Sequence, residues 1–289
     1  MPGLRTCKRL AGGLGPGGGE LGGKGGVGVL TFGSLFSGAG GLDKGLEDAG
    51  FKPVWQVEKN RQCQQVLSLH WPEVKRYSDI IDFLKYIAGG EPVETVDIIC
   101  GGDPCPIRSR ARSNGESKHP DLSGYFLAVV GLMRPQWVVR ENVPASDDVH
   151  FEAALDVLGY RCAIIRTDAS TYTGQQRVRD FIVGSIKTSW PGHAGQLCQT
   201  KGGQRYYSPR CGERQVIPCL TTNRRRYDSR DSYVYDGKLR ILDSDERTAF
   251  AGFPPGWFAG FSEAAIARMC GNAVVPAIGK LIGQIIREV

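Results

Sequence analysis

The sequence lacks several features that mark common protein classes. No apolar run approaches the roughly 20 residues that a helix needs to cross a bilayer. The basic start "MPGLRTCKRL" is followed by glycine and proline rather than by the apolar stretch of a signal peptide. No C-x-x-C or H-x-x-x-H pair is present to anchor a zinc ion. We therefore expect neither a membrane span, nor secretion, nor a metal site.

Regularly spaced cysteines are also missing. The nine cysteines stand singly along 289 residues, which favours reduced thiols inside a cell and hence a cytoplasmic protein. With 41% hydrophobic and 23% charged residues, the chain can form one large core, or a large domain and a small one. A net charge of +6 is weak support for nucleic-acid binding, because the position of the charge matters more than its sum.

Residues 1–28 form a glycine-rich tract with too few apolar side chains to offset the entropy of ordering it, so we expect a disordered tail. Its glycines resemble a phosphate loop only superficially, since no strand precedes them and no Lys-Ser/Thr pair follows.

Alternating strand and helix patterns begin at residue 29 and continue to residue 184. They predict an α/β fold, a doubly wound and mostly parallel sheet with helices on both faces, whose ligands bind at the carboxyl ends of the strands. Strands are expected at 29–35, 52–60, 76–80, 95–100, 136–143, 161–169 and 179–186, and helices at 42–49, 61–71, 125–133 and 151–160.

A glycine-rich turn and two acids follow successive strands. The turn "FSGAGG" lets the backbone approach a ligand, and its spacing differs from the G-x-G-x-x-G of dinucleotide sites. Glu58 is placed to accept hydrogen bonds from ribose hydroxyls, and Asp79 to meet an adenine amino group. Carboxylates repel a pyrophosphate, so an adenosine ligand without phosphates, such as S-adenosylmethionine, fits this pattern better. Turn glycines with two solvated acids are the alternative.

"DIICGGDPCPIRSRARSNG" places Cys105 between two prolines at the end of another strand. The prolines would hold the direction of the sulfur, and the arginines that follow would favour a thiolate or grip phosphates. Glu141 ends the next strand, and Arg177 and Arg179 lie two apart at a strand entry, on one face. Any one of these residues alone is more often structural. The combination of a cysteine, a strand-end glutamate and two paired arginines predicts a catalytic site.

The ordered motifs "LFSGAGGL", "GGDPC", "RENV", "QQRVR" and "RMCGNAVVPAIGK" resemble the DNA (cytosine-5) methyltransferase family over residues 30–289. The resemblance implies that Cys105 attacks cytosine C6, that Glu141 holds and protonates the ring at N3, and that Arg177, with Arg179, steadies the flipped-out base. Methyl transfer from S-adenosylmethionine then gives 5-methylcytosine. The implied cofactor residues are Phe36, Gly38, Gly40, Gly41, Leu42, Glu58, Asp79, Ile80, Pro104, Leu122, Asn272, Ala273 and Val274.

The residue after the catalytic cysteine is usually glutamine in this family, but here it is Pro106, so the details of base flipping differ. Residues 29–184 are expected to form the catalytic domain, 185–262 a small target-recognition region, and 263–289 a segment that returns to the catalytic domain. Only about residues 185–215 are unique recognition sequence, which predicts a short target. The expected nucleic-acid contacts are Arg108, Ser109, Arg110, Arg112, Arg179, Lys201, Arg205, Arg210, Arg224, Arg225 and Arg226.

Two alternatives stay open. One branch of the family methylates tRNA, and the short recognition region would suit a folded RNA loop. A catalytically silent binding subunit is the other, although such proteins tend to lose the cysteine or the cofactor turn. We expect double-stranded DNA as partner and a monomer of prokaryotic or phage origin; the sequence does not reveal a restriction or defence partner.

Overall fold

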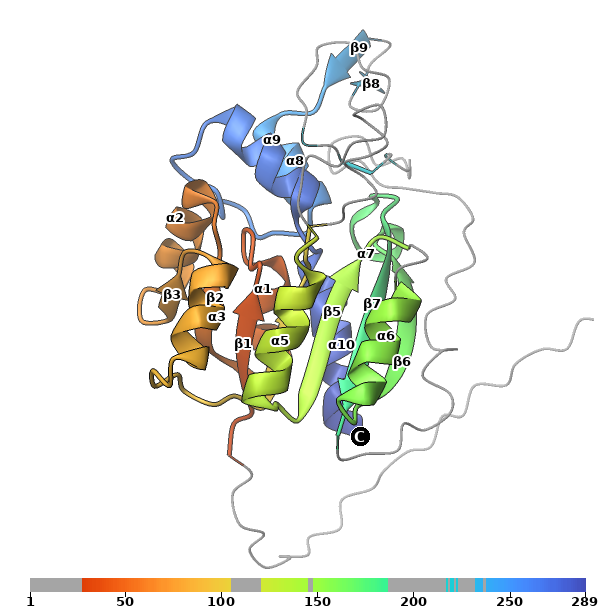
Figure 1. Ribbon diagram of the computed structural model, residues 1–289. Helices are drawn as coiled ribbons and strands as arrows, with labels where there is room; N and C mark the ends of the chain where they lie inside the picture. Colours follow the sequence, from red (N-terminus) through yellow and green to blue (C-terminus); the bar gives the residue numbers. More distant parts are fainter. Residues whose placement is uncertain are drawn as a thin grey trace, which may run out of the picture.

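A seven-stranded sheet forms the centre of the computed structural model, which describes residues 28–104, 121–144, 148–186, 217, 219–220, 222, 232–235 and 238–289 (Figure 1). The strand order is β3-β2-β1-β4-β5-β7-β6. The strands are β1 (Thr31–Leu35), β2 (Lys52–Val57), β3 (Lys75–Tyr77), β4 (Ile98–Gly101), β5 (Trp137–Asn142), β6 (Arg161–Asp168) and β7 (Val178–Ser185).

β1 to β5 pair in parallel, whereas β7 runs antiparallel to both β5 and β6. Only the short helix α7 (Ser170–Thr173) and its flanking turns join β6 to β7. A parallel neighbour needs a crossover of a dozen or more residues, so this connection dictates the antiparallel return. The amino end of β7 consequently lies at the same sheet edge as the carboxyl ends of β1 to β5.

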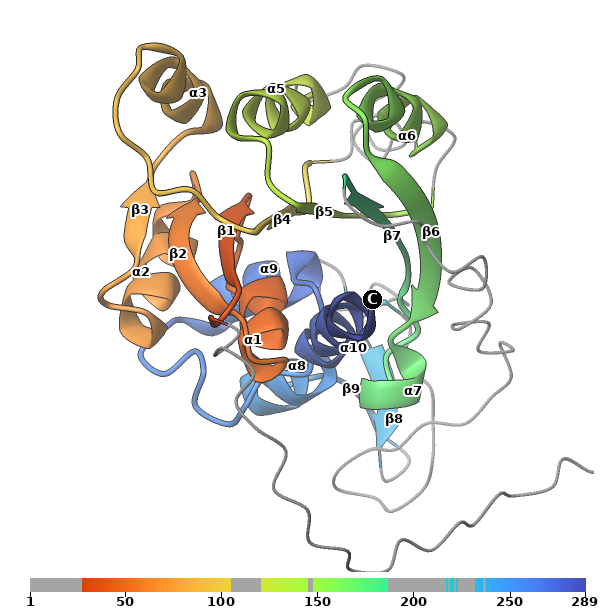
Figure 2. The ribbon, with the colours of Figure 1, turned by 90° about the horizontal axis from the view of Figure 1, so that it is seen from below.

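Helices cover both faces of the sheet, as Figure 2 shows: α3, α5 and α6 lie on one side, and α1, α2 and α10 on the other. The helices are α1 (Gly41–Asp48), α2 (Arg61–His70), α3 (Ile80–Ala88), α5 (Ser123–Met133), α6 (Asp148–Val157), α8 (Ser244–Phe250), α9 (Glu263–Asn272) and α10 (Pro276–Glu288). The predicted doubly wound, mostly parallel α/β fold is confirmed. The sequence did not predict α3, nor the antiparallel direction of β7.

The chain's last helix packs against its first. Gly45 of α1 and Gly279 of α10 meet backbone to backbone, so that a Cβ on Gly45 would lie 2.6 Å from the Gly279 Cα. Isoleucines of α10 fill one core cluster together with Leu42, Leu46 and side chains of the sheet. This contact ties the segment after residue 263 to the glycine-rich turn that precedes α1.

A second cluster joins α2, α8, α9 and the loop around Trp257. His70 stacks on Trp257 with ring centroids 3.4 Å apart, and the Trp257 indole donates to the Ala39 carbonyl at 3.1 Å. The hairpin of β8 (Ser232–Tyr235) and β9 (Lys238–Ile241) extends beyond this cluster (Figure 1). The predicted domain boundaries stay predictions.

One helical stretch, Glu263–Glu288, is long and apolar enough to cross a membrane by length and composition alone. It combines α9 and α10, which are separated by residues 273–275, and 67% of its most apolar window is buried inside the fold. Both helices contribute to the core clusters, as core helices of a folded domain do.

Candidate active site

Most of the predicted site residues in the described part of the chain lie at one edge of the sheet. The parallel strands β1, β2, β4 and β5 end there, and the antiparallel β7 begins there. The order of strands reverses between β1 and β4, and such a reversal opens a crevice for ligands in doubly wound sheets. Residues that are distant in sequence therefore meet at this edge.

The turn after β1 has a strained backbone. Phe36 adopts a φ of 53°, which is unusual for a residue with a side chain and is typical of functional sites. Gly38 has a φ of 56°, and a Cβ there would meet only the Phe36 carbonyl oxygen, at 3.9 Å. Gly38 is thus open to a ligand, whereas Gly40 faces the Trp71 ring and Gly41 faces the Val274 carbonyl. Those two glycines allow close packing of the protein against itself.

Glu58 is held in place by backbone amides. Its Oε2 accepts from the Gly38 N–H at 2.7 Å, and its Oε1 accepts from the Asn60 N–H at 2.6 Å. Burial raises the pKa of Glu58, while these hydrogen bonds act in the opposite direction. The carboxylate keeps further lone pairs, so it can also accept from hydroxyl groups of a ligand.

Asp79 begins α3 and accepts from the Ile81 N–H at 2.8 Å. Its other oxygen forms an ion pair with Lys59 at 2.8 Å, and this contact lowers the pKa of Asp79. Ile80, which follows, is buried in the core. Asp79 thus has local partners of its own as well as its predicted place beside the adenosine ligand.

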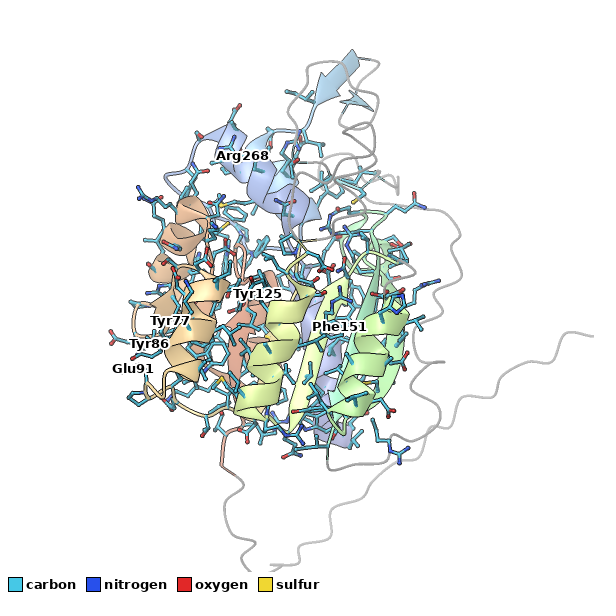
Figure 3. All side chains as sticks on the ribbon, in the orientation of Figure 1. Tyr77, Tyr86, Glu91, Tyr125, Phe151 and Arg268 are labelled. Carbon is cyan, nitrogen blue, oxygen red and sulfur yellow. The ribbon has the colours of Figure 1, made fainter. Side chains whose placement is uncertain are left out.

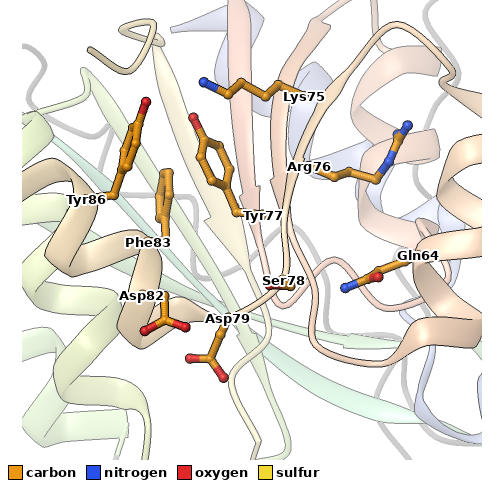
Figure 4. Close-up of a pocket in the computed structure, with 9 residues that line it drawn as sticks. All are labelled: Gln64, Lys75, Arg76, Tyr77, Ser78, Asp79, Asp82, Phe83 and Tyr86. Atoms are coloured by element: carbon orange, nitrogen blue, oxygen red, sulfur yellow. The ribbon is translucent and has the colours of Figure 1, made fainter. Parts of the chain in front are cut away.

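A pocket of about 400 Å³ lies around the edge strand β3 (Figure 4). In the close-up, the Tyr77 and Tyr86 hydroxyls point in one direction, and the Asp79 and Asp82 carboxylates in the other. Among the predicted site residues, only Asp79 lines this pocket. The pocket therefore lies around β3 and includes neither the glycine-rich turn nor Glu58.

Glu141 lies in β5 with its side chain over the end of β4. Its Oε1 forms an ion pair with the Arg179 Nε at 2.9 Å, and a Cβ on Gly102 would come within 2.8 Å of its Oε2. A side chain at position 102 would therefore displace the Glu141 carboxyl, and the pair "GG" before Asp103 is the sequence signal for this close approach. The structure brings together Glu141 and Arg179, as predicted.

Arg177 lies just before β7 and is buried. Its guanidinium donates to the Gly271 carbonyl at 3.2 Å and lies 3.2 Å from the Cys219 sulfur. Arg179 also reaches Cys219, at 4.0 Å, so both arginines lie on one face, as predicted. They connect the sheet edge with residues 219–220 and with the end of α9.

A buried carboxylate below the glycine-rich turn was not predicted. Asp43 accepts from the Ser34 hydroxyl at 2.9 Å and from the Gln56 amide at 2.8 Å. Burial raises its pKa to about 6. Asp43 thus links α1 to β1 and β2.

The remaining predicted cofactor residues surround this edge. Pro104 follows β4, Leu122 precedes α5, and Leu42 is buried in α1. Asn272 ends α9 and is exposed, while Ala273 is buried. The following predicted residues lie outside the described part of the chain: the tail up to residue 27, Cys105, Arg108, Ser109, Arg110, Arg112, Lys201, Arg205, Arg210, Arg224, Arg225 and Arg226.

Four of the five described thiols are poor nucleophiles. Burial raises the pKa of Cys63, Cys162 and Cys270 to about 12, and that of Cys100 well above the ordinary value. The fifth, Cys219, lies against Arg177 and Arg179.

The strand order and the antiparallel β7 define the Rossmann-like class of S-adenosylmethionine-dependent methyltransferases. Within that class, the chain belongs to the C-5 cytosine-specific DNA methylase family, which matches residues 30–196, more than half of its length. The resemblance read from the sequence motifs is confirmed.

Relatives agree with this assignment, and solved structures share the fold. The type II methyltransferase M.AquIA of Picosynechococcus is 36% identical over 117 residues, which cover 38% of this chain and 47% of that protein. A prophage-encoded DNA modification methyltransferase from E. coli superposes with a TM-score of 0.66 at 18% identity, over 90% of this chain and 99% of that one. A Spodoptera frugiperda DNMT2 mutant gives 0.68 at 15%, over 89% and 99%.

The chain spans about half the length of the curated relatives that it matches, with 47%, 40% and 50% of three type II methyltransferases covered. The two solved structures show a shared fold. The comparisons therefore show the family and the fold, whereas evidence on the activity and the substrate comes from the site residues.

Proposed function

We propose that this protein is a DNA (cytosine-5) methyltransferase that uses S-adenosylmethionine and forms a covalent adduct through Cys105. The observation that carries the proposal is the meeting of Glu141 and Arg179 at 2.9 Å beside Gly102, three residues before Cys105, at the edge where Glu58 closes the glycine-rich turn. Family membership supports the reaction, and Glu58, Glu141 and Arg179 are among the groups that the proposed reaction needs.

The described residues fit S-adenosylmethionine. Glu58 is an acceptor held in a fixed direction, which suits ribose hydroxyls, and Gly38 leaves open space above the strained Phe36. Glu58 accepts from the turn at Gly38 and Asp43 lies in the helix that follows the turn, and these two acids would repel a pyrophosphate. When bound, this cofactor supplies an electrophilic methyl group.

Each protein group has a role in the proposed mechanism. The Cys105 thiolate adds to C6 of a flipped-out cytosine, because C5 alone is too weak a nucleophile, and the addition makes C5 electron-rich. Glu141 holds and protonates N3, and Arg179 keeps the Glu141 carboxyl in place. Arg177 steadies the base. After methyl transfer a base removes the C5 proton and the thiolate leaves.

The test is covalent trapping. Duplex DNA containing 5-fluorocytosine should form an adduct with the full chain and S-adenosylmethionine, because fluorine cannot leave as a proton does. Cys105→Ser should abolish the adduct while calorimetry still shows cofactor binding. Cys219→Ser is the matched control, since that thiol lies beside the same arginines, and it should retain the adduct. An adduct that survives Cys105→Ser would contradict the assignment.

A tRNA substrate is the second candidate, and the fold shared with DNMT2 together with the short recognition region favours testing it. Labelled S-adenosylmethionine incubated with duplex DNA or with tRNA separates the two. Label only in tRNA would overturn the DNA proposal, and label in neither would favour a silent binding subunit. We further propose a cytoplasmic monomer without a membrane partner.

A further inference from the structure

A charged residue is buried next to Glu141. Arg140 lies in β5 among apolar residues, and its side chain is only 2% exposed. Its Nε and Nη2 contact the two oxygens of Asp103 at 2.5 and 2.9 Å, and its Nη1 contacts Asp148 at 3.0 Å. The guanidinium also lies 4.2 Å from the ring centre of Phe151, which Figure 3 shows on α6.

Burial of these charges requires an explanation other than stability. Asp103 and Asp148 are 1% and 5% exposed, so three ionic groups have lost their hydration. Apolar side chains of similar volume often give equal or greater stability than such a buried group. A bidentate pair of arginine and carboxylate does, however, fix direction, because the guanidinium is planar and rigid.

The ion pairs connect the segments that carry the proposed chemistry. Asp103 follows β4 and is joined through Pro104 to Cys105, while Arg140 is bonded directly to Glu141. Gly101 of β4 pairs with Arg140 of β5, so the bidentate contact spans the ends of neighbouring strands. Asp148, the first residue of α6, joins this helix to the same guanidinium.

We propose that Arg140 is a positioning residue for methyl transfer. Through its bidentate pair with Asp103, it sets where the chain leaves β4 toward Cys105 relative to the carboxylate of Glu141. The inference rests on the proposed function, since it assigns Arg140 an effect on the distance between two reacting groups. Arg140 does not touch the reacting atoms itself.

Arg140→Lys tests the proposal, because lysine keeps the positive charge and loses the planar geometry. We expect kcat to fall at least tenfold, since a misplacement of about 1 Å can cost roughly 10²-fold. The KM for DNA and the Kd for S-adenosylmethionine should stay within about twofold, because Arg140 is buried and contacts Asp103, Asp148 and Phe151 inside the protein. Asp103→Asn should have the same effect, and it carries the test if Arg140→Lys does not fold.

Arg166→Lys is the matched control. Arg166 also forms a bidentate pair in the same sheet, with Asp180 at 2.7 and 2.7 Å, but its side chain is 64% exposed and it lies in the edge strand β6, not at the end of β4. It should leave kcat within about twofold. Asp148→Asn leaves the bidentate pair intact and should cost much less than Arg140→Lys. The inference would be overturned if Arg166→Lys or Asp148→Asn lowered kcat as much as Arg140→Lys does. Loss of cofactor binding in Arg140→Lys would also overturn it.

Hydrogen exchange separates this inference from the proposed function. The amides of Cys100 and Gly101, which pair with β1 and β5 at the end of β4, should lose protection in Arg140→Lys and Asp103→Asn but not in Arg166→Lys, with no turnover required. If the unmodified protein methylates neither DNA nor tRNA while protection changes in this way, the proposed function fails and the positioning contact stands. Unchanged protection overturns the positioning role.

Discussion

At the scale of single residues, the carboxylates of the site are controlled by different neighbours. Two backbone amides hold Glu58, Lys59 pairs with Asp79, and Glu141 lies between Gly102 and Arg179. An acid that is held by amides is suited to binding, because its direction is fixed by the backbone. Glu141 is instead held by a buried arginine side chain, which keeps its carboxyl in place at the sheet edge.

Asp43 gives the protein a pH-dependent stability. Burial raises its pKa to about 6, so the folded protein holds a proton that the unfolded chain releases at about pH 4. The stabilising contribution is full below the unfolded pKa and is lost as the pH rises through about 6. Asp43→Asn removes this titration and can still bond to Ser34 and Gln56.

We therefore expect the free energy of unfolding of the unmodified protein to rise relative to Asp43→Asn when the pH falls from 7.5 to 4.5. The relative change should be about 1–3 kcal/mol. Urea unfolding of both proteins at the two pH values measures it. Parallel pH dependence of the two proteins would show that Asp43 does not titrate in this range.

At the scale of helices and strands, most of the sheet could be predicted from the sequence because apolar runs mark its strands. The predicted strand at 52–60 is β2, and the helix at 61–71 is α2. Apolar periodicity does not reveal direction, so the antiparallel β7 could not be predicted from its own residues. α3 was not predicted because it begins at Ile80, directly after the short strand β3, and its first apolar residue fits the end of that strand equally well.

The site was partly predictable for a related reason. Strand ends locate Glu58 and Glu141, because parallel strands end at one edge of the sheet. The packing partners of the glycines could not be predicted from the sequence. Gly41, for example, packs against Val274, which is more than 200 residues away in the chain. Arg140 gave a signal as a charge inside an apolar strand, but only the fold shows that Asp103 lies beside it.

The contact between α1 and α10 gives a prediction at this scale. A Cβ on Gly45 would lie 2.4 Å from the Pro276 carbonyl oxygen and 2.6 Å from the Gly279 Cα, both backbone atoms that cannot rotate away. Gly45→Ala should therefore separate the helices and lower the free energy of unfolding by about 1–3 kcal/mol. Cofactor affinity should also fall, because α1 follows the glycine-rich turn.

Gly124→Ala is the control for this change. Gly124 lies in α5, and a Cβ there would meet nothing within 4 Å. Alanine favours helix over glycine by up to about 1 kcal/mol, so Gly124→Ala should leave stability unchanged or increase it. Urea unfolding of the two variants provides the comparison. Equal free energies of unfolding for Gly45→Ala and Gly124→Ala would show that α1 and α10 do not pack this closely.

At the scale of the whole molecule, binding and reading of DNA are expected to come from different parts of the chain. The carboxyl edge of the sheet carries the proposed chemistry, and the segment with Arg224, Arg225 and Arg226 lies between β7 and β8 in the sequence. Arginines without a fixed base partner contact phosphates, which adds affinity but no sequence information. We expect the roughly thirty residues of unique recognition sequence to supply few contacts to base edges.

We accordingly expect a target of about two to four base pairs, because each bidentate base contact discriminates by roughly 1–3 kcal/mol and few are available. Replacing Arg224, Arg225 and Arg226 with glutamine should reduce the slope of log K against log salt by about 2 to 3, without changing the methylated motif. Replacing Lys52 and Lys85 should leave that slope unchanged, since Lys52 begins β2 and Lys85 lies in the last turn of α3, away from the carboxyl edge. Binding titrations at several salt concentrations and sequencing of methylated cytosines test both expectations. A strict six-base-pair site would contradict them and would mean that a partner or another segment reads the DNA.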